Sequence, residues 1–125
     1  MKTILVVEDE SRLLDLLRTM LEEAGYCVVG AKDGAEARDH YRRQQGQIDL
    51  VLCDMALPKF GGWTVYLMLK EINPEVKVIL TSGYLDPRIK SELVQGGAID
   101  FIPKPYVADK LLQSIAQAFN TERAA

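Results

Sequence analysis

The chain has 125 residues, a formal net charge of -3 at pH 7, and 48% hydrophobic and 26% charged residues. This length fits one compact domain, and this composition excludes a disordered chain because enough apolar side chains are present to build a core. The slightly acidic balance argues against direct nucleic-acid binding, since phosphate contacts need clustered lysine and arginine. No apolar run approaches the roughly 20 residues of a membrane helix, so we expect no membrane contact.

The N-terminal residues and the cysteines indicate the compartment. One lysine and a short apolar run open the chain, and acidic residues follow at once. This pattern is not a signal peptide, so we expect a cytoplasmic protein. Cys27 and Cys53 lie in apolar runs without a metal-binding partner, which predicts two buried, reduced thiols. The single histidine, His40, lies in a polar stretch, so mechanisms that need a histidine base have little support.

Short apolar runs alternate with amphipathic segments from the first residues onward. The run Ile4–Val7 predicts a strand buried on both faces. The helix after it ends at Gly25, which stands in the position of a C-cap glycine. Tyr26–Val29 predicts the second strand, and Asp33 followed by Glu36 resembles a capping box that begins the second helix. The apolar face of the first helix consists of Leu13, Leu17, Met20, Leu21 and Ala24.

The middle of the chain repeats the pattern. Leu50–Cys53 predicts the third strand, and a helix containing Trp63 and Tyr66 follows it. We interpret these two aromatic residues as packing or partner-surface residues. Val76–Leu80 predicts the fourth strand.

The last part of the chain adds two helices and a strand. Asp86-Pro87 supplies an N-cap and a first-turn proline for the fourth helix, which Gly96-Gly97 ends. Ala98–Ile102 predicts the fifth strand. The buried stripe of the last helix consists of Ala108, Leu111, Leu112, Ile115 and Phe119.

Strands and helices that alternate in this way form right-handed βαβ units, in which helices cover both faces of a parallel sheet. We therefore expect a single α/β domain over residues 1–125. Its ordered core should span about residues 3–120, because terminal residues fray.

Polar residues interrupt this pattern at the ends of the strands. Glu8 and Asp9 follow the first strand, Asp54 ends the third, Thr81 ends the fourth, and Lys104 lies just past the fifth. The carboxyl ends of parallel strands meet at one edge of the sheet, where ligands bind. We therefore expect three carboxylates, one hydroxyl and one ammonium group to converge there.

This group of side chains suits phosphoryl transfer. Two carboxylates about 4 Å apart repel each other by about 4 kcal/mol at an effective dielectric constant of about 20. Three carboxylates therefore require a cation, and oxygen ligands favour a hard ion such as Mg²⁺ or Mn²⁺. A metal ion beside Asp54 would orient it as a nucleophile and neutralise a phosphoryl group. Thr81, or alternatively Ser82, would donate a hydrogen bond to that group, and Lys104 an ion pair.

These residues resemble the receiver domains of bacterial two-component response regulators over nearly the whole chain. Each matching segment is weak alone, but together, in this order and at strand ends, they form a strong signal. The resemblance implies a flavodoxin-like α/β fold, in which a doubly wound five-stranded parallel sheet of order 2-1-3-4-5 carries five helices. The segments are Ile4-Leu5-Val6-Val7-Glu8-Asp9-Glu10, Asp54-Met55-Ala56-Leu57-Pro58 with Gly62, Leu80-Thr81-Ser82-Gly83 and Lys104-Pro105.

The resemblance also implies a metal site and an acceptor. Asp54 matches the phosphoacceptor. Asp9 matches a direct metal ligand, Glu8 the other acid of the pair, and Ala56 the residue whose backbone carbonyl completes the site around Asp54. Glu10 is expected to serve only the following helix, where acidic residues are favourable.

A second group of residues matches the switch. Thr81 and Phe101 resemble the switch pair, and Lys104 resembles the lysine that contacts the phosphoryl group. Phe101 lacks the hydroxyl of the tyrosine that often stands there, and Glu8 replaces the commoner aspartate.

The implied function is a phosphorylation switch. A histidine kinase or a histidine phosphotransfer protein would donate a phosphoryl group to Asp54 in a Mg²⁺-dependent reaction. The face built from the fourth helix, fifth strand and fifth helix would then change shape for a downstream protein or an attached domain, and the same face is a candidate for a homodimer. Such a domain is not an enzyme for other substrates and catalyses only its own phosphorylation and dephosphorylation.

Two other functions remain open. A phosphatase with an aspartate nucleophile would need a second aspartate two residues after Asp54, where this chain has Ala56. A receiver used as a scaffold, without phosphorylation, would be favoured by an incomplete acidic site, whereas the predicted site is complete.

Overall fold

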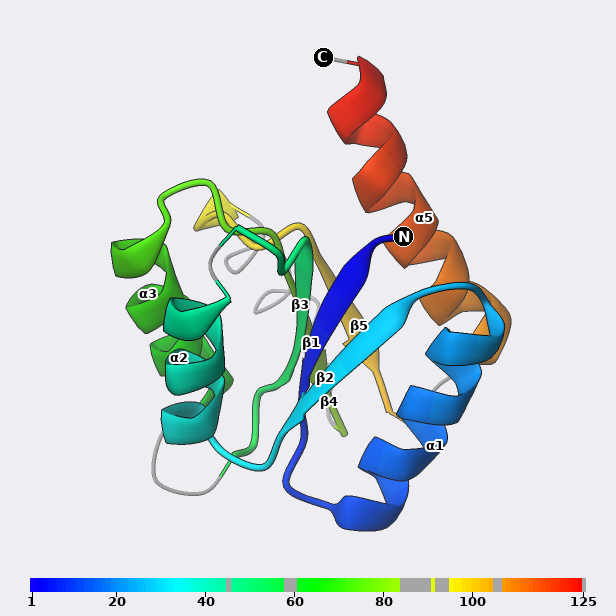
Figure 1. Ribbon diagram of the computed structural model, residues 1–125, viewed down its shortest axis with the longest axis horizontal. Coiled ribbons are helices and arrows are strands. Elements are labelled where there is room, and N and C mark those ends of the chain that lie inside the picture. Colours follow the sequence, from blue (N-terminus) through cyan, green and yellow to red (C-terminus); the bar gives the residue numbers. More distant parts are fainter. Residues whose placement is uncertain (45, 58–60, 84–90, 92–94, 105–106, 125) are drawn as a thin grey trace.

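The computed structural model describes residues 1–44, 46–57, 61–83, 91, 95–104 and 107–124, and only the backbone of residues 101, 103 and 121–124. At its centre lies one five-stranded parallel sheet in the order β2-β1-β3-β4-β5 (Figure 1). The number and order of the strands agree with the prediction. The strands are β1 (Thr3–Val7), β2 (Cys27–Ala31), β3 (Leu50–Asp54), β4 (Val78–Ser82) and β5 (Asp100–Pro103).

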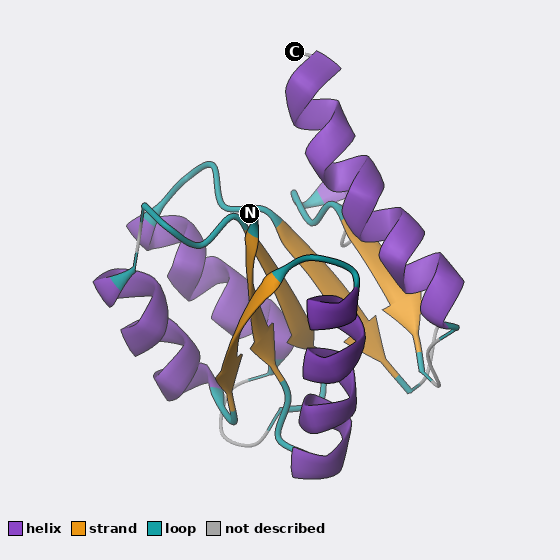
Figure 2. Ribbon diagram, turned by 45° about the vertical axis from the view of Figure 1, so that its right-hand side comes forward, coloured by secondary structure: helices purple, strands orange, loops and turns teal. Residues whose placement is uncertain are grey.

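Helices cover both faces of this sheet, as Figure 2 shows. The described helices are α1 (Ser11–Glu23), α2 (Gly34–Arg43), α3 (Gly62–Ile72) and α5 (Ala108–Ala124). Most of the predicted helix between Asp86-Pro87 and Gly96-Gly97 lies outside the described residues. None of the helices in the described part of the chain is both long and apolar enough to span a membrane.

The sheet separates two apolar cores because successive strand residues point to opposite faces. One core, which we call the α1–α5 core, packs Val6 of β1 and Leu52 of β3 against α1 and α5. The other, the α2–α3 core, packs Val7 and Cys53 of the same strands against α2 and α3. The central strands are therefore buried on both faces, as their unbroken apolar sequences predicted.

Local signals in the sequence set the helix boundaries. Gly25 has a φ of 97°, a left-handed conformation that lets the chain turn away after α1. Ala24 is the exposed C-cap of α1, so it does not belong to the predicted apolar face. The Asp33 carboxylate accepts a hydrogen bond from the Glu36 N–H at 2.8 Å, which confirms Asp33 as the N-cap of α2. The Glu36 carboxylate accepts from the Lys32 N–H at 3.4 Å, one residue before the position that a capping box requires.

Three strands begin later than predicted. β2 begins at Cys27 instead of Tyr26, β4 at Val78 instead of Val76, and β5 at Asp100 instead of Ala98. Val76 is apolar and buried, yet its N–H donates to Asn73 O at 3.0 Å in a turn that precedes the strand. The apolar runs therefore include residues of the turns that precede the strands. A search for hydrophobic runs cannot distinguish a buried turn from a strand.

The prediction for the cysteines is only half correct. Cys53 is buried in β3, whereas Cys27 is exposed at the start of β2, and both are free thiols. β2 lies at the edge of the sheet, so it lacks the second neighbouring strand that would cover its first residue.

Candidate functional site

Three polar side chains meet at the carboxyl ends of the central strands. Glu8 follows β1, Asp54 ends β3, and Thr81 lies in β4 in register with Asp54. Glu8 and Asp54 come two residues after Val6 and Leu52, so they lie on the α1–α5 side of the sheet. All three are buried, with exposed fractions of 2% for Glu8, 4% for Asp54 and 1% for Thr81.

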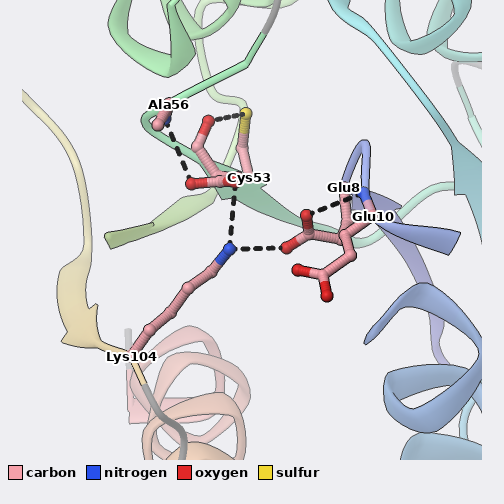
Figure 3. Close-up of polar contacts among 6 residues, drawn as sticks. Glu8, Glu10, Cys53, Ala56 and Lys104 are labelled. Carbon is pink, nitrogen blue, oxygen red and sulfur yellow. Dashed lines mark hydrogen bonds and ion pairs between the residues drawn. The ribbon is translucent and has the colours of Figure 1, made fainter. Parts of the chain in front are cut away.

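The Lys104 ammonium group lies between the two buried carboxylates (Figure 3). Its Nζ is 2.8 Å from Glu8 Oε1 and 3.0 Å from Asp54 Oδ2. The backbone places this lysine, because its N–H donates to Ser82 O at 2.7 Å and so fixes the chain after β5 to the end of β4. The side chain of Lys104 is 20% exposed, so the ion pairs are largely shielded from water.

Backbone N–H groups bind the other oxygen of each carboxylate. Asp54 Oδ1 accepts from the Ala56 N–H at 3.1 Å, and Glu8 Oε2 accepts from the Glu10 N–H at 3.1 Å. Each carboxylate is therefore held at both oxygens, and its plane is fixed before any ligand arrives.

Burial and charge shift two proton equilibria at the site. Burial raises the pKa of Glu8 and the Asp54 charge adds to this shift, while hydrogen bonds from Lys104 and Glu10 oppose it. Burial also raises the pKa of the Cys53 thiol, and the charges of Asp54 and Glu8 act in the same direction. Cys53 is therefore protonated at neutral pH and is not a nucleophile.

The acidic side chains fit a hard cation. Carboxylate oxygens of Glu8, Asp9 and Asp54 lie within 4.8 Å of one another. Asp9 is exposed, so one side of the group is open to solvent, while Glu8 and Asp54 are buried. An all-oxygen donor set with several negative charges suits Mg²⁺ or Mn²⁺ better than a soft metal.

The structure brings together most of the residues that the sequence singled out. Glu8, Asp9, Asp54 and Lys104 form one cluster, and Thr81 is adjacent in the sheet. The side chain of Phe101 lies outside the described residues, and its backbone pairs with Leu80 in the sheet.

Three contacts were not predicted. Lys104 was expected to face a phosphoryl group, and its ion pair with Glu8 was missed. Ala56 was expected to contribute its carbonyl, yet the contact seen is its N–H on Asp54. Glu10 was expected to serve only α1, yet its N–H binds Glu8. Almost every residue has a backbone N–H, so the residue type does not predict the two backbone contacts. The only signal in the sequence is that each donor stands two residues after the acid that accepts from it.

Comparison with known proteins identifies this arrangement. Residues 4–116 match the family model described as the response regulator receiver domain. The chain is 34% identical over 118 residues to Protein CcdB of Bacillus subtilis (strain 168), covering 94% of this chain and 97% of that protein. It is 31% identical over 118 residues to Chemotaxis protein CheY of the same strain, again covering 94% and 97%.

Solved structures agree over the same length. A response regulator receiver domain protein from Clostridium thermocellum superposes with a TM-score of 0.92 at 30% identity, covering 99% of this chain and 98% of that chain. A chain of the CheX-CheY-BeF3-Mg+2 complex from Borrelia burgdorferi gives 0.90 at 28% identity, covering 94% and 89%. Fold, site and sequence thus agree, and the chain belongs to the response regulator receiver domain family.

Proposed function

We propose that Asp54 is the residue through which this receiver domain is switched. Receiver domains are phosphorylation-dependent signalling switches, and this chain is one of them. The observation that carries the assignment is the position of Asp54, whose Oδ2 lies 3.0 Å from the Lys104 ammonium at the edge of the sheet. A phosphoryl group attached to Asp54 could form an ion pair with this Lys104 ammonium group.

The reaction transfers a phosphoryl group from a phosphohistidine of a kinase or phosphotransfer protein. An Asp54 carboxylate oxygen forms the new bond to phosphorus, the N–P bond breaks, and the imidazole keeps the electron pair. The Ala56 N–H orients Asp54, and Lys104 and the Thr81 hydroxyl bind the transferred oxygens. The domain thus catalyses its own phosphorylation, and the loss of the group, without acting on other substrates.

We assign Mg²⁺ or Mn²⁺ to Glu8, Asp9, Asp54 and the carbonyl of Ala56. These residues would hold the ion, which would supply positive charge to neutralise the phosphoryl oxygens. Support comes from the three carboxylates within 4.8 Å and from the BeF3-Mg+2 complex of the related structure. The alternative of a phosphatase with an aspartate nucleophile gains no support, because Ala56 has no acidic side chain.

The proposal also covers how phosphorylation of Asp54 is transmitted to a binding partner. Thr81 and Phe101 form the switch pair, and the face of β5, α5 and the predicted fourth helix binds a downstream protein or domain, or a second copy. The predicted fourth helix, most of which lies outside the described residues, would complete the five-helix receiver fold. The domain functions in the cytoplasm, a reducing compartment consistent with its free cysteines.

Beryllofluoride, a phosphoryl mimic, tests the assignment of Asp54. Trp63 is the only tryptophan and follows Gly62, whose backbone packs against that of Asp54. We expect saturable fluorescence changes in the wild type only when Mg²⁺ and beryllofluoride are both present. Asp54→Asn should abolish the response to beryllofluoride, whereas Asp109→Asn, at an exposed position of α5, should preserve it. A folded wild-type protein without this response, or a responsive Asp54→Asn, would contradict the proposal.

A further inference from the structure

The strand β2 presents an open edge. Cys27 N–H donates to Lys2 O at 2.9 Å, and Ala31 O accepts from Glu8 N–H at 2.9 Å, so these residues face β1. Backbone groups alternate in direction along a strand, so those of Val28 and Gly30 point away from the sheet. An edge of this kind is a template on which another strand can add.

β2 contains no charged residue or proline of its own, and its nearest flanking charge is Lys32, after its last residue. Residues 26–31 read Tyr-Cys-Val-Val-Gly-Ala, without a charge or a proline. Edge strands usually prevent unwanted pairing with an inward or flanking charge, a proline or a bulge. Short apolar segments with high strand propensity and no charge are, by contrast, the segments that associate. Lys32 lies at one end of β2, so protection of the middle of this edge has to come from another element.

Arg18 of α1 provides a cation at that edge. Its Nη1 donates to Val28 O at 3.1 Å, which occupies one outward backbone acceptor of β2. The neighbouring Leu17 and Leu21 are fully buried in the α1–α5 core, so the helix is fixed and the guanidinium reaches β2 from a rigid base. Arg18 is itself only partly exposed.

Gly30 leaves the room that this arginine uses. A Cβ atom at Gly30 would lie 2.8 Å from Arg18 Nη2 and 3.2 Å from a methyl group of Leu14. Any side chain there would displace the guanidinium group, which is the flexible partner in this contact. The glycine thus weakens the strand but permits Arg18 to lie along its edge.

We propose that Arg18 guards the β2 edge and prevents it from pairing with β2 of a second copy of this chain. The guanidinium group donates a hydrogen bond to the Val28 carbonyl. It also places a positive charge where the second strand would lie. Two approaching copies would bring two such cations together, which opposes pairing. This role is independent of phosphorylation at Asp54.

Two variants remove the Arg18 guanidinium group from the β2 edge in different ways. Arg18→Met keeps the apolar stem and removes the donor and the charge, and Gly30→Ala keeps the arginine but displaces it. Arg12→Met, on the exposed face of α1, makes the same charge change away from β2. Sedimentation over a concentration series should show about a twofold or greater rise in average mass for the first two variants relative to wild type and Arg12→Met.

Amide hydrogen exchange identifies the surface that pairs. We expect the Val28 and Gly30 amides to exchange rapidly in the wild type and to become protected in the associated variants. Wild-type masses for both variants, with folding verified by circular dichroism, would overturn the proposal. Association that leaves these two amides unprotected would also overturn it, because another surface would then be responsible. If Arg18→Met fails to fold, Gly30→Ala still decides the question.

Discussion

At the carboxyl edge of the sheet, one lysine makes the burial of two acidic side chains tolerable. Glu8 and Asp54 are almost completely removed from water, and Lys104 lies within 3.0 Å of an oxygen of each. Removing one partner from a buried ion pair leaves an uncompensated charge, which costs more than the pair itself contributes. The stability of the folded domain therefore depends on the ammonium group that we also propose to bind the phosphoryl oxygens.

Replacing Lys104 with methionine separates these contributions. The variant keeps the apolar stem but leaves Glu8 and Asp54 without a counter-charge. We expect its free energy of unfolding to fall by about 3 kcal/mol at neutral pH without divalent ions. Mg²⁺ should recover more stability in the variant than in the wild type, because it replaces the missing charge and binds the folded state. Urea unfolding with and without Mg²⁺ measures both effects.

Lys110→Met is the matched control for this experiment, because Lys110 is an exposed residue of α5. Its free energy of unfolding should change by less than about 0.5 kcal/mol. Equal losses in the two variants would show that the effect is a general response to net charge, and would contradict the role given to Lys104.

The sequence predicted which acidic side chains gather at the site, but not how they are held. Glu8 and Asp54 could be placed because strand ends of a parallel sheet converge. The bridge from Lys104 to Glu8 spans 96 positions of the chain and depends on side-chain conformations that no local pattern encodes. The assigned roles of Asp54 as acceptor and Thr81 as switch residue remain predictions.

At the scale of the elements, side chains that satisfy helix ends have measurable effects. Asp33 accepts from the Glu36 N–H at 2.8 Å and so satisfies one of the free donors at the start of α2. We expect Asp33→Ala to lower the free energy of unfolding by about 1 kcal/mol. Asp39→Ala removes an exposed carboxylate from the same helix and should have a smaller effect. Urea unfolding tests this difference, and equal effects would refute the capping role.

Prediction of the strand bounds was most accurate for two of the three strands that have a neighbour on each side. β1 and β3, in the middle of the sheet, were predicted to within one residue at each end. The shifts at β2, β4 and β5 arose because buried turns and edge strands break the simple relation between apolar sequence and strand. Cys27 shows the same limit, since its apolar neighbours suggested burial but its position at the edge exposes it.

At the scale of the whole molecule, Glu8 makes stability depend on pH. Burial raises the pKa of Glu8 above its ordinary value of 4.5. The folded state then binds this proton more tightly than the unfolded state does. The resulting contribution to stability is fully present below pH 4.5 and is lost as the pH rises through the folded-state pKa.

Glu8→Gln removes this titration while keeping a side chain that can accept from Lys104. We expect the free energy of unfolding of the variant, relative to wild type, to increase as the pH rises from about 4 towards neutrality without divalent ions. Glu22→Gln, at an exposed position of α1, should give no such trend. A difference for Glu8→Gln that stays constant or decreases over this range would contradict the raised pKa.

Phosphorylation of Asp54 is the central claim, and intact-mass spectrometry tests it most directly. The wild type and Asp54→Asn are incubated with acetyl phosphate and Mg²⁺, with a chelator added to a parallel sample. We predict the mass of one phosphoryl group on the wild type only, and its absence with chelator. An equal mass gain in Asp54→Asn would contradict the assignment of the acceptor.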